Sequence, residues 1–334
     1  MRLAGRVANR ARDYLLFNSA LEKFWHARMR GKVTSLLYHQ VDNSPETGFL
    51  RRGGSPAISP SGFRSELQFL REQRVRFLTF GQIAAGEYPS EDECGVALCF
   101  DDCFLNNYTC GLDLLEEFGI KATFFQTTAM VDAATLIWEH RLYWHTRDEA
   151  QAAAFRRLAL ETCTDTAGLA AMSSRELVEY LREQVQFDEC ARLLMLADSR
   201  LSSAAELASV ARRIYPASDH LRRARQLGHE IGSHGHQHLK RVNISEAGFQ
   251  RDLEQSGEML TSILGAAPRC FSYPFDSHLA KDAEFVRRHF DVAATVGKRT
   301  FTRNTDPMWL PRFTWPGPAK NRLRLRRWLL TGTL

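Results

Sequence analysis

The stretch VALCFDD, residues 96–102, decides the fold expected for this chain. Its first five residues are apolar, which is typical of a short strand buried on both faces of a sheet. The run ends at two adjacent carboxylates, Asp101 and Asp102. Parallel α/β proteins carry their chemistry where the strands end, so the paired acids are candidates for an active site. The alternative is an Asp-Asp turn that caps the next helix, because Asp is also a favoured turn and N-cap residue.

A second candidate segment lies far downstream, where residues 230–238 read EIGSHGHQH. His234 and His238 are four positions apart, and on a helical turn such residues share one face and can bind a single ion. Two imidazoles and one carboxylate make a three-ligand site with open positions for water, which is typical of hydrolytic metal sites. His236 lies between the two and is expected to point elsewhere. The alternative is that this His-rich turn is a solvated loop.

Several segments together resemble the motifs of the polysaccharide deacetylase (NodB-like) family of carbohydrate esterases. LCFDDCFLNNY (98–108) resembles the TFDDG motif, SHGHQH (233–238) the H-S-x-x-H motif, and PRCFSYPFD (268–276) the third motif. LLYHQV (36–41) resembles the opening strand of a subgroup with circularly rearranged motifs, and LPRF (310–313) resembles a late strand. The resemblance implies an α/β fold, a distorted (β/α)7-type barrel that occupies residues 33–317.

The same resemblance implies a metal-dependent hydrolase that removes an N-acetyl group from an amino sugar. Asp102, His234 and His238 would hold a divalent ion, with zinc favoured by ligand type and nickel, cobalt or iron left open. The ion would acidify a water molecule, and Asp101 would remove a proton from that water as it attacks.

Three further roles follow from the resemblance. Arg269 would orient and stabilise Asp101, and a backbone N–H near Tyr273 would help to hold the oxyanion. His39 would protonate the departing amine, because the late Leu-x-x-x-x-His motif of the best-known family members is absent. His278 is the reserve candidate for that acid.

Two positions depart from the family pattern. Cys103 stands where the family usually has Gly after the paired acids, and Asp276 replaces the Gly of the third motif. Gly adopts positive φ freely, so both replacements put the local turn in doubt. Cys103 also adds a soft side chain that could ligate a metal or narrow the pocket.

The separation between the paired acids and the histidines is far more than two strand–helix units require, since each takes roughly 30 residues. The excess is rich in Ala, Leu, Arg and Glu with helical periodicity, which predicts a helical insertion over residues 139–226. Its expected role is a lid or wall that selects the substrate. The insertion begins beside Trp138, whose ring could stack on a sugar or belong to the core.

The composition is that of an ordinary globular protein, with 44% hydrophobic and 25% charged residues in a chain of 334. A net charge of +5 is too mild for this length to argue for nucleic acid, and none is expected as a partner. The 7 cysteines include no CxxC pair, which argues against a disulfide framework and favours a reducing, cytoplasmic compartment.

Both ends of the chain are basic and apolar. Residues 1–32 predict an Arg-rich amphipathic helix without the apolar run of a secretory signal or a membrane span. Residues 318–334 intersperse Arg with Leu and contain no acid. Each end could pack on the barrel or lie on anionic lipid, where each basic residue near the surface adds ~1 kcal/mol. These features favour a peripheral protein of the inner membrane face and a lipid-linked or nucleotide-linked N-acylated sugar, such as a precursor of bacterial surface polysaccharide.

Two rival functions come from other classes. One is a catalytically impaired, metal-free carbohydrate-binding relative, which Cys103 permits but the intact acids and histidines oppose. The other is a basic membrane or nucleic-acid adaptor that keeps the barrel only as a scaffold. Salt-dependent DNA binding without amidase activity would favour the adaptor.

Overall fold

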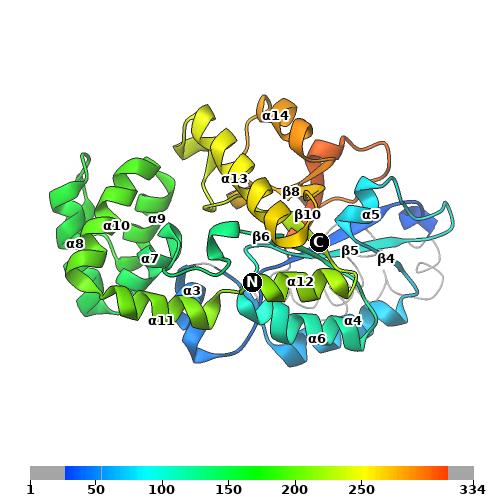
Figure 1. The fold of residues 1–334 in the computed structure, drawn as a ribbon, viewed down its shortest axis with the longest axis horizontal. Coiled ribbons are helices and arrows are strands. Elements are labelled where there is room, and N and C mark those ends of the chain that lie inside the picture. Colours follow the sequence, from blue (N-terminus) through cyan, green and yellow to red (C-terminus); the bar gives the residue numbers. More distant parts are fainter. Residues whose placement is uncertain (1–26, 54, 315–334) are drawn as a thin grey trace, which may run out of the picture.

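A computed structural model describes residues 27–53 and 55–314, and the centre of the fold is a parallel barrel (Figure 1). Its seven strands are β1 (Val33–Tyr38), β5 (Gly95–Phe100), β6 (Thr123–Gln126), β7 (Glu230–Ser233), β8 (Cys270–Ser272), β9 (Val292–Val296) and β10 (Leu310–Thr314). The order around the sheet is β1-β10-β9-β8-β7-β6-β5, and β5 pairs again with β1, which closes the barrel. The prediction of a distorted (β/α)7-type barrel is therefore confirmed.

The barrel closes along β5, the strand expected from the VALCFDD stretch. One edge of β5 runs beside β1 over its whole length, from Gly95 opposite Val33 to Phe100 opposite Tyr38. The other edge pairs first with β4 (Arg76–Leu78) and then with β6. Every residue of β5 is buried, as its continuous apolar run predicts. Because the strand ends at Phe100, the two following acids emerge at the carboxyl mouth of the barrel.

Helices cover the outside of the barrel, as strand–helix alternation predicts. They are α4 (Pro60–Glu72), α5 (Phe80–Ala84), α6 (Leu112–Glu117), α12 (Ser218–Gln226), α13 (Glu246–Leu264) and α14 (Asp282–His289). The first of these begins after Ser59, whose side chain accepts a hydrogen bond from the Gly62 amide. Two short strands, β2 (Gln40–Val41) and β3 (Ala57–Ile58), form a separate parallel pair.

The helical insertion lies to one side of the barrel, in green in Figure 1. It consists of α7 (Trp138–His145), α8 (Glu149–Thr162), α9 (Ser174–Glu183), α10 (Phe187–Leu201) and α11 (Ala204–Ile214), with the short α3 (Gly48–Gly53) packed against α7. These helices share a hydrophobic core of their own, which includes Phe155, Leu177, Leu194 and Val210.

The helical stretch predicted over residues 139–226 is divided between two cores. Leu221 and Ala224 of α12 pack into the barrel core, and α12 leads directly into β7. The insertion with its own core therefore ends with α11, and α12 serves the barrel as an ordinary crossover helix.

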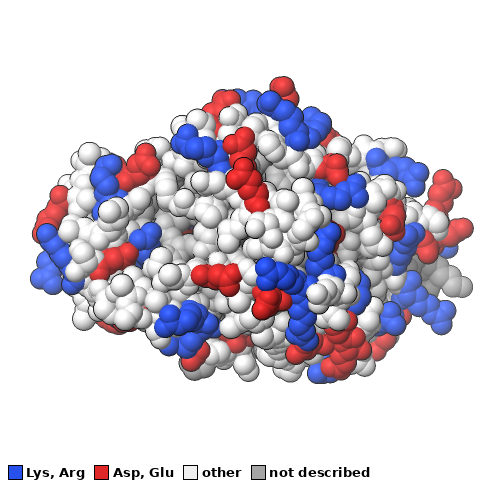
Figure 2. All heavy atoms as spheres, viewed as in Figure 1, with Lys and Arg blue, Asp and Glu red and all other residues white. Residues whose placement is uncertain are grey.

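The surface shows no dominance of one charge sign on the face in Figure 2, where basic and acidic side chains are interspersed. Among the described helices, none combines the length and the apolar character needed to cross a bilayer. The predicted tail at 318–334 and the predicted basic helix up to residue 26 lie outside the described residues.

Candidate active site

A cavity of about 330 Å³ opens at the carboxyl mouth of the barrel. Its walls come from two parts of the chain. The barrel contributes His39, Asp101, Asp102, His234 and His238. The insertion contributes Glu139, His140, Tyr143 and Arg182. The predicted catalytic acids and histidines thus share one cavity.

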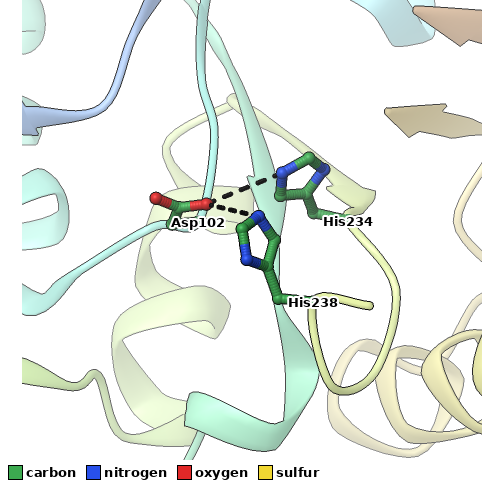
Figure 3. Close-up of side chains that lie close together, drawn as sticks. All are labelled: Asp102, His234 and His238. Carbon is green, nitrogen blue, oxygen red and sulfur yellow. Dashed lines mark ion pairs between the residues drawn. The ribbon is translucent and has the colours of Figure 1, made fainter. Parts of the chain in front are cut away.

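The three predicted metal ligands meet at one point (Figure 3). Oδ1 of Asp102 lies 3.6 Å from Nε2 of His234 and 3.2 Å from Nε2 of His238. The three ligand atoms all lie within 4.8 Å of one another, and all three residues are buried. His236 points elsewhere, as expected, with its Nδ1 2.9 Å from the Thr128 hydroxyl. The fold thus brings together ligands that are distant in sequence.

The orientation of the two imidazoles fits a divalent cation. Nδ1 of His234 lies 2.9 Å from the backbone oxygen of Ser272, and Nδ1 of His238 lies 2.9 Å from Oε2 of Glu139. A ring nitrogen that faces an oxygen acceptor donates its hydrogen, and in the neutral ring this leaves the other nitrogen with a free lone pair. Both rings therefore present Nε2 to Asp102, and this donor set suits zinc and related metals.

The two histidines differ in their affinity for a proton. Burial lowers the pKa of His234 to about 4, although the Asp101 carboxylate opposes that change. Burial acts in the same direction on His238, but the carboxylates of Asp102 and Glu139 outweigh it and raise the pKa to about 9. At neutral pH a cation would therefore displace a proton from His238 and none from His234.

The expectation that the histidines share a helical turn is wrong. The segment after β7 is a loop in which Gly235 has a φ of +75°. A Cβ at Gly235 would lie 2.5 Å from a carboxylate oxygen of Asp252, so this position requires glycine. The same carboxylate accepts hydrogen bonds from the amides of His236 (2.9 Å) and Gln237 (2.8 Å). Asp252, on α13, therefore shapes the ligand loop, and the loop spacing alone did not reveal it.

Asp101 is bound by Arg312 and not by the predicted partner. Nη1 of Arg312 donates to Oδ1 at 2.5 Å, and Nη2 donates to Oδ2 at 2.8 Å. The Ser272 hydroxyl adds a donor at 3.3 Å from Oδ2. Burial alone would raise the pKa of this carboxyl, but the Arg312 guanidinium outweighs it and holds the pKa well below the usual range. Asp101 is therefore ionised at neutral pH.

The prediction that Arg269 orients Asp101 is wrong, and the parallel sheet explains why. Arg269 precedes β8 and so lies at the amino end of the strands, whereas Asp101 follows β5 at the carboxyl end. Its guanidinium is half-exposed and pairs with Asp291 at 2.7 Å. Arg312, within the LPRF strand, was the signal available in the sequence, because a charged residue inside an apolar strand requires a buried partner.

Tyr273 lines the cavity, and the role of a backbone N–H near it in holding the oxyanion stays a prediction. The amide N–H of Tyr273 donates to the Ala294 carbonyl at 3.2 Å, and the following Pro274 has no N–H. The phenol ring stacks on Trp309, with ring centroids 5.4 Å apart. The ring therefore packs in the barrel wall, while the buried hydroxyl has no hydrogen-bond partner among the described residues.

Trp138 does not line this cavity. Its buried indole Nε1 donates to the backbone oxygens of Gln237 (3.0 Å) and His238 (3.1 Å). Of the two interpretations of this ring, the core one applies, and the sequence did not reveal that the ring also fixes the histidine loop.

The two candidates for the acid lie in different environments. His39 lines the cavity, and its buried Nδ1 has no hydrogen-bond partner in the described part of the chain. His278 does not line the cavity and packs against Trp309, with ring centroids 4.7 Å apart. His39 is the better placed of the two, and its role stays a prediction.

The two replaced glycines keep the backbone that glycine would adopt. Cys103 has a φ of +63° and Asp276 a φ of +53°. The Cys103 thiol is fully buried in the barrel core and donates to the Phe100 backbone oxygen at 3.5 Å. Burial raises its pKa well above the ordinary value. Its sulfur is not among the ligand atoms that converge in the described part of the chain, which come from Asp102, His234 and His238. The Asp276 carboxylate accepts a hydrogen bond from the Val296 amide at 2.7 Å, which supports the turn.

The sequence did not single out Glu139 as a site residue. Besides its contact with His238, Glu139 accepts hydrogen bonds from the Tyr143 hydroxyl and from Nη1 of Arg182, the latter at 3.4 Å. The available signal was a glutamate directly after Trp138 in WEHRLYWH, a helical segment rich in aromatic residues and histidine.

Comparison with known proteins agrees with this geometry. The family described as polysaccharide deacetylase matches residues 89–185 and 195–290, more than half of the chain. No curated protein sequence matches significantly.

Solved structures of low sequence identity share the fold. The Streptococcus pyogenes deacetylase PplD, in complex with acetate, is 14% identical with a TM-score of 0.54 over 86% of this chain and 93% of that one. IcaB from Ammonifex degensii is 16% identical with a TM-score of 0.54, over 90% and 97% of the two chains. The polysaccharide deacetylase BC0361 from Bacillus cereus is 14% identical with a TM-score of 0.55, over 90% and 69%.

Proposed function

The chain belongs to the polysaccharide deacetylase family, and we propose that it is a metal-dependent hydrolase that removes an N-acetyl group from an amino sugar. One observation carries the proposal. Asp102, His234 and His238 meet within 4.8 Å, beside the separate carboxylate of Asp101, in one cavity. Hydrolysis by an activated water requires such an arrangement, in which three ligands hold the ion and a separate carboxylate acts as the base. The acetate in the structure of the Streptococcus pyogenes relative supports an acetyl group as the part released.

Asp102, His234 and His238 would hold the cation, with zinc preferred and nickel, cobalt or iron also compatible with these ligands. When bound, such an ion polarises a carbonyl and lowers the pKa of a water molecule. The protein itself fixes the direction of its ligands, since both imidazoles already have Nε2 turned to the Asp102 carboxylate.

Asp101 would accept the proton of the attacking water. Arg312 and Ser272 hold its carboxylate in place and ionised, so it needs no rearrangement before the proton arrives. Oδ2 of Asp101 lies 3.8 Å from Nε2 of His234, which keeps the base beside the ligand atoms without joining them.

His39 would complete the reaction on the leaving-group side. The water oxygen forms a bond to the acyl carbon, the C–N bond of the amide breaks, and the nitrogen takes a proton from His39. The products are a short carboxylate, acetate in the simplest case, and a free amino sugar. The buried Nδ1 of His39 without a described protein partner supports a role toward a bound group.

The insertion supplies the wall opposite the ligands and would contact the sugar or its carrier. We propose a lipid-linked or nucleotide-linked sugar, or a glycan precursor of surface polysaccharide, as the substrate. We also propose a peripheral position on the cytoplasmic face of the membrane. Flotation of the full chain with anionic and with neutral vesicles tests this position, and equal failure to float with both would contradict it.

Release of acetate tests the proposed reaction. Purified full-length protein is incubated with N-acetylated lipid-linked, nucleotide-linked and oligosaccharide substrates, alongside the variants Asp101→Asn and Arg269→Gln. We expect metal-dependent acetate release from at least one substrate. The rate of release should fall about 100-fold or more in Asp101→Asn and should be unchanged in Arg269→Gln. Sugar binding with no bound metal and no acetate release would instead favour the metal-free carbohydrate-binding protein.

A further inference from the structure

The helical insertion reaches the metal ligands through a single carboxylate. Glu139, in the first turn of α7, is buried, and its Oε2 lies 2.9 Å from Nδ1 of His238. Its other oxygen accepts hydrogen bonds from the Tyr143 hydroxyl and from Arg182. Both oxygens of the carboxylate are therefore occupied by protein donors.

These donors hold Glu139 in an outer position. Arg182 lies on α9 and also donates to the Tyr143 hydroxyl at 3.0 Å, so two helices of the insertion support the same carboxylate. A carboxylate restrained in this way is directed at the far nitrogen of the imidazole and not at the space between the ligand atoms.

The second ligand histidine has a different kind of support. Nδ1 of His234 faces the backbone oxygen of Ser272, a residue of barrel strand β8. The acceptor for His234 is a neutral carbonyl of the barrel, whereas the acceptor for His238 is a charged side chain of the insertion. A side-chain substitution can therefore remove the hydrogen-bond acceptor of His238 but not the backbone acceptor of His234.

An independent contact shows the same helix holding the backbone of His238. The indole of Trp138, the residue before Glu139, donates to the carbonyl oxygens of Gln237 and His238 at 3.0 Å and 3.1 Å. Two successive residues of α7 therefore fix both the main chain and the ring of one ligand.

We propose that Glu139 is a positioning residue for the ligand His238 and that the insertion thereby completes the metal site of the barrel. This inference rests on the proposed metal-dependent function. A carboxylate on the far nitrogen of a ligating imidazole fixes its tautomer and strengthens it as a ligand, and loss of such a partner typically weakens metal binding by about 10–100-fold.

Zinc affinity of the metal-stripped protein tests the proposal; it is measured by competition with a chelator and compared after correction for the proton that His238 binds in each variant. Glu139→Gln keeps the shape and one acceptor oxygen but removes the charge, and Glu139→Ala removes both. The matched control is Glu161→Gln, an exposed glutamate on α8 of the same insertion that pairs with Arg200. We expect the control to bind zinc as the wild type does, Glu139→Gln to bind about 10-fold more weakly, and Glu139→Ala up to about 100-fold more weakly.

A second readout does not depend on activity. In the zinc-loaded wild type the proton on Nδ1 of His238 should be visible by NMR as a slowly exchanging signal, and it should disappear in Glu139→Ala. If Glu139→Ala does not fold, the nearly isosteric Glu139→Gln decides the question through its affinity.

The outcomes separate this inference from the proposed function. Equal zinc affinity in the wild type and Glu139→Gln, with acetate release intact, overturns the role of Glu139 and leaves the hydrolase standing. Absence of zinc binding in the wild type overturns the hydrolase, and with it this inference.

Discussion

The barrel and the helical insertion both border the cavity, but they contribute to it in different ways. The barrel contributes Asp101, Asp102 and both histidines, at positions set by where strands β5 and β7 end. The insertion contributes side chains from helices that have their own hydrophobic core. In the barrel, the ends of the strands position the acids and histidines. In the insertion, the packing of the helices positions the cavity wall and Glu139, the hydrogen-bond partner of His238.

This difference between barrel and insertion indicates that the insertion tolerates substitutions without loss of the reaction better than the barrel site does. The base and its partners Arg312 and Ser272 all lie on barrel strands or at their ends, and each is buried. In the described part of the chain, the insertion reaches this group indirectly, through the contacts of Glu139 and Trp138 with His238. Substitutions in the insertion should therefore alter metal affinity and substrate choice, while substitutions of Asp101, Arg312 or Ser272 in the barrel should lower the rate of catalysis most.

The largest effect is expected for Asp102→Ala, which removes a ligand supplied by the barrel. Zinc affinity should fall by more than the roughly 100-fold that loss of an outer partner causes, and acetate release should stop. Metal analysis and the acetate assay measure both. Tight zinc binding in Asp102→Ala would contradict the proposal that Asp102 of the barrel is a metal ligand.

The next effect is expected for Arg312→Leu, which leaves the buried Asp101 carboxylate without its partner. Removal of one member of a buried ion pair costs about 3–5 kcal/mol in the free energy of unfolding. Arg269→Gln is the matched control, because its half-exposed pair with Asp291 is worth about 0–1 kcal/mol. Denaturant unfolding of the metal-free proteins measures both, and equal losses would contradict the assignment of Arg312 as the buried partner.

A smaller effect concerns pH and distinguishes the two histidines. In the metal-free protein the pKa of His238 is about 9 and that of His234 about 4, so only His238 must release a proton when metal binds near pH 7. Apparent zinc affinity, corrected for zinc hydrolysis, should therefore rise about 10-fold per pH unit between pH 7 and 9. Calorimetry in buffers of different ionisation enthalpy should show about one proton released at pH 7. In Glu139→Gln the pH dependence should move to lower pH, because a carboxylate that favours the protonated ring is gone; an unchanged dependence would argue against the contact.

The smallest effect is expected for Trp138→Phe, which removes the indole donor from the two loop carbonyls but keeps a ring. Loss of that hydrogen bond should cost about 0.5–1.5 kcal/mol in the free energy of unfolding and slightly weaken zinc binding. Trp144→Phe is the control in the same helix, since its indole nitrogen has no hydrogen-bond partner within the described ranges. A larger loss in the control would show that ring size and not the hydrogen bond matters.

Much of the barrel could be read from the sequence because its signals are local. Short apolar runs that alternate with amphipathic helices predict a parallel barrel or sheet, the resemblance to the deacetylase family implies the barrel, and the acids after β5 predict the position of its mouth. Asp102, His234 and His238 could be proposed as ligands because their residue types and motif spacing suit a metal site, and the structure brings them within 4.8 Å of one another. The division of the predicted helical stretch at α12 was not readable, since helical periodicity does not say which core a helix joins.

The sequence by itself determined the residue types of the site and the strand that delivers the paired acids, because these follow from patterns along the chain. Only the tertiary structure decided the partners of those residues. Arg312 and not Arg269 binds Asp101, because parallel strands place the residue before β8 and the residue after β5 at opposite ends of the barrel. Glu139 meets His238 because α7 packs over the mouth of the barrel, a contact between residues 99 positions apart that no local pattern encodes.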